Sequence, residues 1–202
     1  MDFWSKYAYF YDASEKLNGK VYKEMTELTK RLTPNGAAVI DCASGTGELA
    51  IAAASKAEKV LCTDNSEEML QVAKKKSEKR GALNVEFARR NIFALEEPDE
   101  SFDVVIAGNI LHLLGDPEKA VHELFRVTKH GGKILLPTFM TKRVTDISKL
   151  LLKAYRKMGY SPCSEYSPRE YIEMLKKTGC GRVKFKLIRG NVPCCYAVIV
   201  KD

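Results

Sequence analysis

The chain has 202 residues, of which 45% are hydrophobic and 29% are charged, so we expect one soluble globular domain with a single core. No apolar run is long enough to span a bilayer, and the N-terminus lacks the basic and apolar segments of a secretory signal. These features exclude an integral membrane protein with spanning helices, and we expect a cytoplasmic location.

The formal net charge of +7 does not by itself indicate a nucleic-acid partner. The basic residues are spread along the chain, and the run over 74–76 lies beside acidic residues on a predicted helix, which is typical of a solvated face. A nucleic-acid site would need basic and aromatic residues interleaved on one surface. We expect a small-molecule partner instead, and the sequence does not predict an oligomeric state.

The six cysteines show neither a CxxC pair nor a cysteine–histidine spacing that suits a metal. In a reducing compartment such residues are typically free thiols. We therefore expect no disulfide and no metal site.

The first half of the chain alternates between amphipathic segments and short apolar runs. In chain order, the predicted elements are a helix over 14–32, a strand over 37–42, a helix that ends near residue 55, a strand over 60–63, a helix that ends at Gly81 and a strand over 85–88. Either Asn65 or Ser66 can cap the helix that follows the second strand.

The second half continues the same alternation. The predicted elements are a strand over 102–107, a helix from Pro117 that stops at His130, a strand over 133–136, an amphipathic helix over 145–158, a helix that ends at Gly179, and strands over 183–188 and 195–200. Asp116 is placed to cap one helix, and Ser167 with Glu170 forms a capping box at another.

Strands separated by helices of this length predict parallel βαβ units, whereas the last two strands, joined without a helix, must be antiparallel. The predicted fold class is therefore α/β, a Rossmann-like, doubly wound and mostly parallel seven-stranded sheet with one antiparallel strand near an edge and helices on both faces. We expect a single domain over 1–202. Its expected parts are an N-terminal helical lid over 1–33, a cofactor-binding core over 34–137, and acceptor-side helices with the antiparallel strand pair over 138–202.

The most informative segment is VIDCASGTGELA, residues 39–50, in which a buried strand leads through a glycine-containing turn into a helix. Gly45 and Gly47 allow the backbone to approach a ligand closely, and ligands of open α/β sheets bind at such turns. A tight strand-to-helix turn without a ligand is the structural alternative.

Asp64 ends the second predicted strand, 17 positions after Gly47. A carboxylate at this spacing can accept hydrogen bonds from both ribose hydroxyls of an adenosine. Its alternative role is to cap the following helix. The glycine turn and the acid together favour an adenosine-containing cofactor, but Gly45, Gly47 and Ala50 also satisfy the G-x-G-x-x-A pattern of dinucleotide-binding proteins.

Four segments, in order, resemble the motifs of class I S-adenosylmethionine-dependent methyltransferases. They are VIDCASGTG, LCTDNSEEMLQVAKKK, FARRNIFALEEPDESFDVVIAGNILHLLGD and RVTKHGGKIL, and the resemblance as a whole covers about residues 35–137. The chain is most similar to the ubiquinone/menaquinone-biosynthesis-like group (methyltransferase types 11 and 25). The resemblance implies S-adenosyl-L-methionine as cofactor and S-adenosyl-L-homocysteine as product.

The resemblance also implies roles for residues around the glycine turn. Asp41 would brace the loop and lie near the amino group of the methionine part. Ala43, Ser44, Gly45 and Gly47 would line the methionine and ribose parts. The family usually has glycine where this chain has Ala43, which predicts weaker or displaced cofactor binding.

Further along the chain, the resemblance implies the contacts of the adenosine. Asp64 would hold the ribose hydroxyls with Asn65 beside it, and Met69 would pack near the adenine. Asn91 and Ile92 would meet the adenine edge through an amide side chain and a backbone N–H. The family usually has aspartate where this chain has Asn91.

Three residues are expected near the reacting atoms. Asn109 would border the methionine end, and Tyr11 of the N-terminal segment would close over the sulfonium. His112 is the candidate catalytic base because imidazole titrates near neutral pH. A packing role for His112 is the alternative.

We expect a methyltransferase that acts on a small molecule by in-line transfer. Two alternatives remain on the sequence alone: an NAD(P)-dependent oxidoreductase that uses the G-x-G-x-x-A turn, and a non-catalytic S-adenosylmethionine-binding protein.

Overall fold

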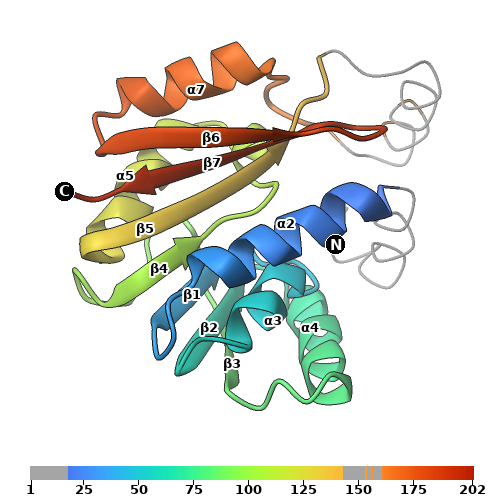
Figure 1. Cartoon of the computed structure of the whole chain (residues 1–202), viewed down its shortest axis with the longest axis vertical. Coiled ribbons are helices and arrows are strands. Elements are labelled where there is room, and N and C mark those ends of the chain that lie inside the picture. The colour runs from blue at the N-terminus through green and yellow to red at the C-terminus, as the bar shows by residue number, and fades with distance from the viewer. Residues whose placement is uncertain (1–17, 143–152, 154–155, 157–160) are drawn as a thin grey trace.

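The computed structural model describes residues 18–142, 153, 156 and 161–202. Its strands are β1 (Ala38–Cys42), β2 (Lys59–Asp64), β3 (Val85–Arg89), β4 (Phe102–Ile106), β5 (Thr128–Phe139), β6 (Arg182–Ile188) and β7 (Cys194–Val200). They form one sheet in the order β3-β2-β1-β4-β5-β7-β6 (Figure 1).

The direction of the strands agrees with the predicted fold class. Strands β1 to β5 run parallel to one another, whereas β7 is antiparallel to both β5 and β6. Since β6 is an edge strand, the single antiparallel strand lies next to an edge. The prediction of a mostly parallel seven-stranded sheet is confirmed.

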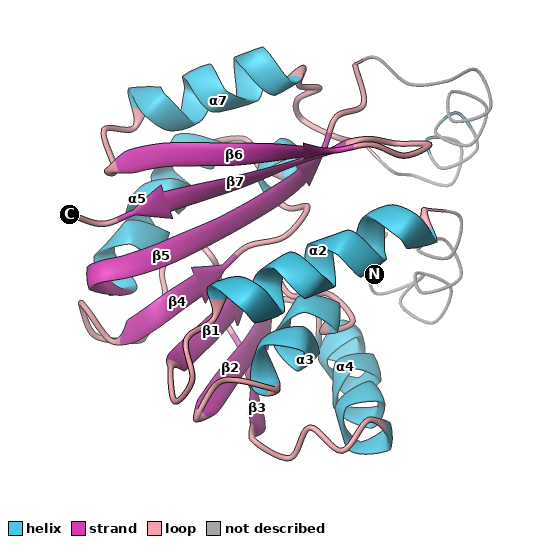
Figure 2. Cartoon of the chain, viewed as in Figure 1, coloured by secondary structure: helices cyan, strands magenta, loops and turns pink. Residues whose placement is uncertain are grey.

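The helices cover both faces of this sheet (Figure 2). They are α2 (Gly19–Leu32), α3 (Glu48–Ala54), α4 (Glu67–Lys79), α5 (Pro117–Val127), α7 (Pro168–Lys177) and the short 3₁₀ helix η1 (Leu111–Leu113). One apolar cluster joins α2, α3 and α4 to the sheet, and a second joins α5 and α7 to the opposite face. Neighbouring residues of a strand enter different clusters, as Val39 and Ile40 of β1 do, which explains why the central strands are apolar throughout.

The helix boundaries largely follow the local signals in the sequence. The hydroxyl of Ser66, and not the side chain of Asn65, caps α4 by accepting the N–H of Met69. Asp116 caps α5, and the capping box of α7 is present at Ser167. These caps confirm the predicted starts of the three helices.

The end of α5 differs from the prediction. This helix ends at Val127, and β5 begins at Thr128, whereas the sequence suggested a helix to His130 and a strand from 133. The glycines at 131 and 132 lie within β5, where the pairing with β4 shifts register. A Cβ on Gly132 would lie 2.7 Å from the carbonyl oxygen of Lys129, so the irregular part of the strand needs glycine there. In the sequence, the same Gly-Gly pair looks like a helix stop.

Helix α2 crosses the sheet with the predicted apolar face inward, since Val21, Met25 and Leu28 are buried. Its start is held by the β6–β7 connection. The side-chain amide of Asn18 donates to the carbonyl of Val192 at 2.8 Å, and a Cβ on Gly190 would lie 2.2 Å from Val21. The C-terminal hairpin therefore fixes a helix from the opposite end of the chain.

The cysteines and the helix lengths bear on the remaining expectations. All six cysteines are free thiols, as expected. No helix in the described part of the chain is long and apolar enough to cross a membrane. The predicted helix over 145–158 lies almost wholly outside the described residues.

Candidate active site

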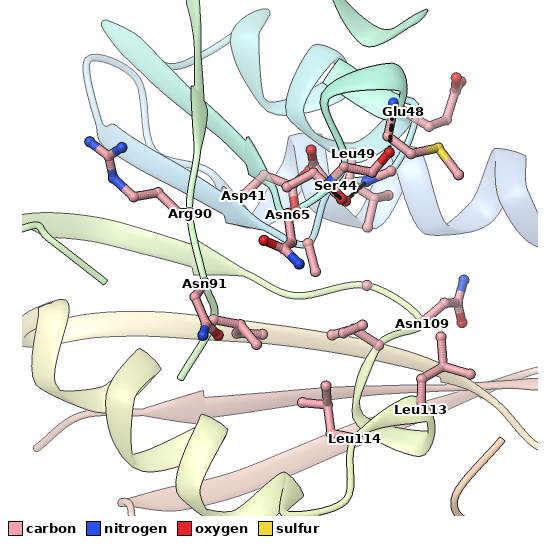
Figure 3. Close-up of a pocket in the computed structure, with 18 of the residues that line it drawn as sticks. Asp41, Ser44, Glu48, Leu49, Asn65, Arg90, Asn91, Asn109, Leu113 and Leu114 are labelled. Atoms are coloured by element: carbon pink, nitrogen blue, oxygen red, sulfur yellow. Dashed lines mark hydrogen bonds between the residues drawn. The ribbon is translucent and has the colours of Figure 1, made fainter. Parts of the chain in front are cut away.

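A cavity of about 270 Å³ lies at the carboxyl ends of β1, β2 and β4. The strand order reverses between β1 and β4, so the loops after these two strands diverge and leave a crevice. Figure 3 shows the loop after β1 facing Asn109, Leu113 and Leu114 across this space. The fold therefore places the predicted site at its topological switch point.

Most predicted cofactor-binding residues come together here. Those that line the cavity are Asp41, Ala43, Ser44, Gly45, Asp64, Asn65, Met69, Asn91, Ile92 and Asn109. Gly47 and His112 are not among the lining residues, and Tyr11 lies outside the described residues.

The loop between β1 and α3 has an unusual backbone. Ala43, Gly45 and Gly47 all adopt positive φ angles, of 51°, 56° and 76°. The N–H of Ser44 donates to the carbonyl of Thr63 at 2.9 Å, which fastens the loop to the end of β2. A glycine at position 43 would adopt this conformation without strain, whereas alanine in the left-handed region costs about 1–2 kcal/mol.

The two glycines of the loop have different tasks. Gly45 lines the cavity, and a Cβ built on it would meet nothing within 4 Å. A Cβ on Gly47 would instead lie 3.0 Å from the Cβ of Ala73 in α4. Gly45 thus leaves room beside the cavity, and Gly47 allows α4 to approach the loop from behind.

Asp64 connects the glycine loop to the start of α4. Its Oδ2 accepts the N–H of Gly45 at 2.9 Å, and its Oδ1 accepts the N–H of Ser66 at 2.8 Å. A carboxylate oxygen accepts more than one hydrogen bond, so these donors orient the group without excluding the hydroxyls of a ligand. Asp64 does not cap α4, since Ser66 does, and its bonds to the two loops are compatible with binding a ligand.

Asp41 is the least ordinary group of the cavity. It is 1% exposed, and neither carboxylate oxygen has a hydrogen-bond partner among the described residues. Burial raises its pKa to about 8; the N–H of Ala50 opposes this rise without making a full hydrogen bond, and the charge of Asp64 adds to it. A buried carboxylate without partners is costly, which points to a ligand that supplies positive charge or donors.

The far end of the cavity is formed by the segments after β2 and β3. The side-chain oxygen of Asn91 accepts the N–H of Phe93 at 3.0 Å, which folds 91–94 into a tight turn. Met69 and Ile92, both buried, also line the cavity. Apolar side chains and an oriented amide in one lining suit an aromatic heterocycle.

Asn109 shapes the opposite end. It has a positive φ of 55°, which asparagine tolerates better than most residues. Its N–H donates to the carbonyl of Pro137 at 2.7 Å, and its side-chain oxygen accepts the N–H of Phe139 at 3.0 Å. These bonds hold the loop after β4 against the end of β5.

His112 lies on η1 and is 4% exposed. Burial lowers its pKa to about 4, so its imidazole is neutral at pH 7. Its backbone carbonyl accepts the N–H of Ser164. The predicted role as a base is untested by this geometry and stays a prediction.

The sequence did not reveal the contribution of α2. Tyr22 and Met25 line the cavity, and the ring of Tyr22 meets that of Phe139 edge-on with centroids 5.6 Å apart. The apolar spacing of α2 indicated a packed helix but not where it packs. Arg90 was also missed; it lines the cavity while pairing with Glu97 at 2.9 Å.

The fold and the site define the class of protein. A doubly wound sheet of this strand order, with a glycine loop after β1 and a carboxylate at the end of β2, is the class I methyltransferase form of the Rossmann-like fold. A family model described as a methyltransferase domain matches residues 34–179. The chain belongs to this family of S-adenosylmethionine-dependent methyltransferases.

Individual relatives agree with this assignment. The chain is 40% identical over 187 residues to the ubiquinone/menaquinone biosynthesis C-methyltransferase UbiE of Bdellovibrio bacteriovorus, covering 82% of this chain and 79% of that protein. It is 25% identical over 195 residues to the UbiE of Francisella tularensis subsp. holarctica, covering 86% and 78%. A solved methyltransferase structure from Thermotoga maritima has a TM-score of 0.77 at 19% identity, covers 99% of both chains and supports the fold. An NAD(P)-dependent oxidoreductase is therefore not retained.

The residues of the cavity fit S-adenosylmethionine. The donor carries an ammonium group and a sulfonium, and the cavity offers the unpaired buried carboxylate of Asp41. Asp64 supplies a second, oriented carboxylate that suits a pair of ribose hydroxyls.

Proposed function

We propose that the protein transfers a methyl group from S-adenosylmethionine to a small, largely apolar molecule. The observation that carries this proposal is the division of the cavity. Carboxylates lie on the side of β1 and β2, whereas Ile110, Leu113 and Leu114 form an apolar wall after β4. A cationic donor suits the first side, and an apolar acceptor suits the second.

The donor is proposed to bind through residues of three loops. Asp64 would accept the two ribose hydroxyls, and Asp41 would face the ammonium group. The backbone of Ala43, Ser44 and Gly45 would pass close to the ribose and methionine parts. The support for these roles is that all five residues line one cavity and that the Asp41 carboxylate is otherwise without a hydrogen-bond partner among the described residues.

The adenine is proposed to pack near Met69 and to meet Asn91 and Ile92 at its edge, with Asn65 beside Asp64 at the ribose. The oxygen of Asn91 already accepts a backbone N–H, so this residue offers less to the adenine amino group than a carboxylate would. The departure at position 91 therefore weakens, but does not remove, the recognition of the base.

When bound, S-adenosylmethionine supplies a methyl carbon that a nucleophile attacks in line, with the positively charged sulfur as the leaving group. The chain contributes alignment and the exclusion of water, which together can lower a barrier by about 7–11 kcal/mol. Tyr22 and Met25 of α2 and Leu113 of η1 surround the cavity and would hold the acceptor in place. We keep Tyr11 as a candidate for closing over the sulfonium and His112 as a candidate base.

The proposed domain organisation follows the division of the cavity into a donor side and an acceptor side. Residues 34–137 would bind the donor, and 138–202 with α2 would complete the acceptor side, within one domain. We also propose that the protein works in the cytoplasm, on the sequence grounds given above.

The first test compares ligands by thermal unfolding. S-adenosylmethionine and S-adenosylhomocysteine should raise the melting temperature, and NAD should not; stabilisation by NAD alone would remove the donor assignment. Transfer of a labelled methyl group should then be measured on a panel of phenols and quinol-like compounds, polar amines and thiols. The names of the relatives motivate the first group. Activity confined to highly charged acceptors would contradict the apolar acceptor side.

A further inference from the structure

One face of α4 contacts the back of the glycine loop. Ala73, Lys76 and Arg80 are spaced by three and four residues and so lie on one side of the helical segment. Ala73 packs against the position where Gly47 lacks a Cβ, and the other two side chains reach the loop with their charged ends. This face lies behind the loop, on the side away from the cavity.

Lys76 makes the central contact. Its ammonium donates to the hydroxyl of Thr46 at 2.8 Å and to Oε2 of Glu48 at 3.3 Å. The lysine side chain is only 12% exposed, and Thr46 is 1% exposed. Lysine is rarely buried to this extent unless it is paired, so the contact is specific and largely shielded from water.

The position of Thr46 in the loop gives this contact its importance. The N–H of Gly45, one residue before, bonds to the carboxylate of Asp64. Gly47, one residue after, packs on Ala73 and is the N-cap residue of α3. Thr46 is thus the middle of the turn, and Lys76 holds its side chain between these two fixed points.

Glu48 extends the same network to the cavity lining. Its Oε1 accepts from Arg80 at 2.8 Å and its Oε2 from Lys76, so both oxygens are held by α4. Arg80 is far more exposed than Lys76, with 47% of its side chain accessible, so its ion pair contributes less. Lys76 is therefore the main polar connection between α4 and the loop.

We propose that Lys76 is a positioning residue for the methyl donor. It lies behind the loop and acts by fixing residues 45–48 in the conformation that receives the donor. The inference rests on the proposed donor site. It predicts that Lys76 controls donor affinity and KM more than the rate of transfer at saturation, because the reacting atoms lie on the other side of the loop.

The test measures binding of S-adenosylhomocysteine by calorimetry. Lys76→Met retains the apolar stem but removes the charged hydrogen bonds, and it should weaken binding about 10-fold or more. With an acceptor found, KM for the donor should rise similarly while kcat at saturation changes less than about threefold. Lys74→Met, on the same helix at an exposed position, is the matched control and should bind like the wild type.

A second variant separates positioning from general stability. Thr46→Val removes the same hydrogen bond from the loop side, and the double variant with Lys76→Met should bind about as weakly as Lys76→Met alone. If Lys76→Met does not fold, Thr46→Val must still weaken binding. Wild-type affinity in folded Lys76→Met or in Thr46→Val, alongside weakened binding in Asp64→Ala, would overturn this inference alone. A wild-type protein that does not bind S-adenosylhomocysteine would overturn the donor site itself.

Discussion

Asp41 and Asp64 face one cavity from the adjacent parallel strands β1 and β2. Burial, and to a smaller extent the negative charge of Asp64, raise the pKa of Asp41 to about 8. Asp64 is held by two backbone donors, whereas Asp41 has no hydrogen-bond partner among the described residues. The two acids thus meet the cavity in different states. Without a cationic ligand, Asp41 is largely protonated at neutral pH, whereas Asp64 is oriented for hydrogen bonding.

This relationship predicts a pH-dependent stability. Between about pH 4 and pH 8 the folded protein binds a proton at Asp41 that the unfolded chain releases, so the contribution of Asp41 to the free energy of unfolding falls as the pH rises. Asp41→Asn removes this effect. We expect the variant to be more stable than the wild type at pH 8, by up to about 5 kcal/mol, and the difference to shrink towards pH 5.

Urea denaturation at several pH values measures this difference. Glu86→Gln, an exposed acid on β3, is the control and should not change the pH dependence. An Asp41→Asn protein that loses stability at pH 8 would contradict the unpaired, buried state of this carboxylate. Because the proposed ammonium contact would also be lost, the stabilised variant should bind the donor more weakly.

Asp64→Ala should weaken the binding of S-adenosylhomocysteine about 10-fold or more, because it removes charge-assisted hydrogen bonds to the ribose. It also frees the N–H groups of Gly45 and Ser66 that the carboxylate now orients. Asp64→Asn keeps one acceptor oxygen and should lie between the alanine variant and the wild type. Equal affinities for all three proteins in calorimetry would show that the ribose is held elsewhere.

Ala43→Gly tests the strained backbone of the loop. Relief of the positive φ of Ala43 should offset the greater entropy of glycine in the unfolded chain. We expect unchanged stability or a gain of up to about 1 kcal/mol in chemical denaturation. Ala52→Gly, within the regular helix α3, should instead lose about 1 kcal/mol. Similar losses at both positions would contradict the strain at residue 43.

The pH dependence of stability due to His112 has the opposite sign to that due to Asp41. Its pKa of about 4 lies below the usual value of 6.5, so the folded protein excludes a proton that the unfolded chain accepts. The contribution of His112 to stability should therefore fall by about 3 kcal/mol as the pH drops from 6.5 to 4, and His112→Ala, which lacks this contribution, should differ from the wild type by that amount in its pH dependence. Turnover of the folded His112→Ala protein distinguishes the two roles. Retained turnover assigns His112 to packing, and a selective loss with intact donor binding identifies it as the base.

Local patterns predicted much of the fold because they depend on neighbouring residues. Ser66, Asp116 and Ser167 cap helices where the sequence suggested, since a cap needs only its own helix turn. The sequence predicted the start of β5 at residue 133 instead of 128 because Gly131 and Gly132 suit both a helix stop and a strand irregularity. Only the pairing of β5 with β4 distinguishes these two uses.

The amino-acid sequence by itself determined the fold class, the protein family and most of the predicted residues that line the cavity, because the strand–glycine–helix pattern and the acid at the end of β2 are short-range features. Tertiary structure alone decided which distant side chains complete the cavity. Tyr22 reaches it because the C-terminal hairpin holds α2 in place, and Lys76 reaches Thr46 because Gly47 lets α4 approach. These contacts join residues far apart in the chain, so no local pattern records them.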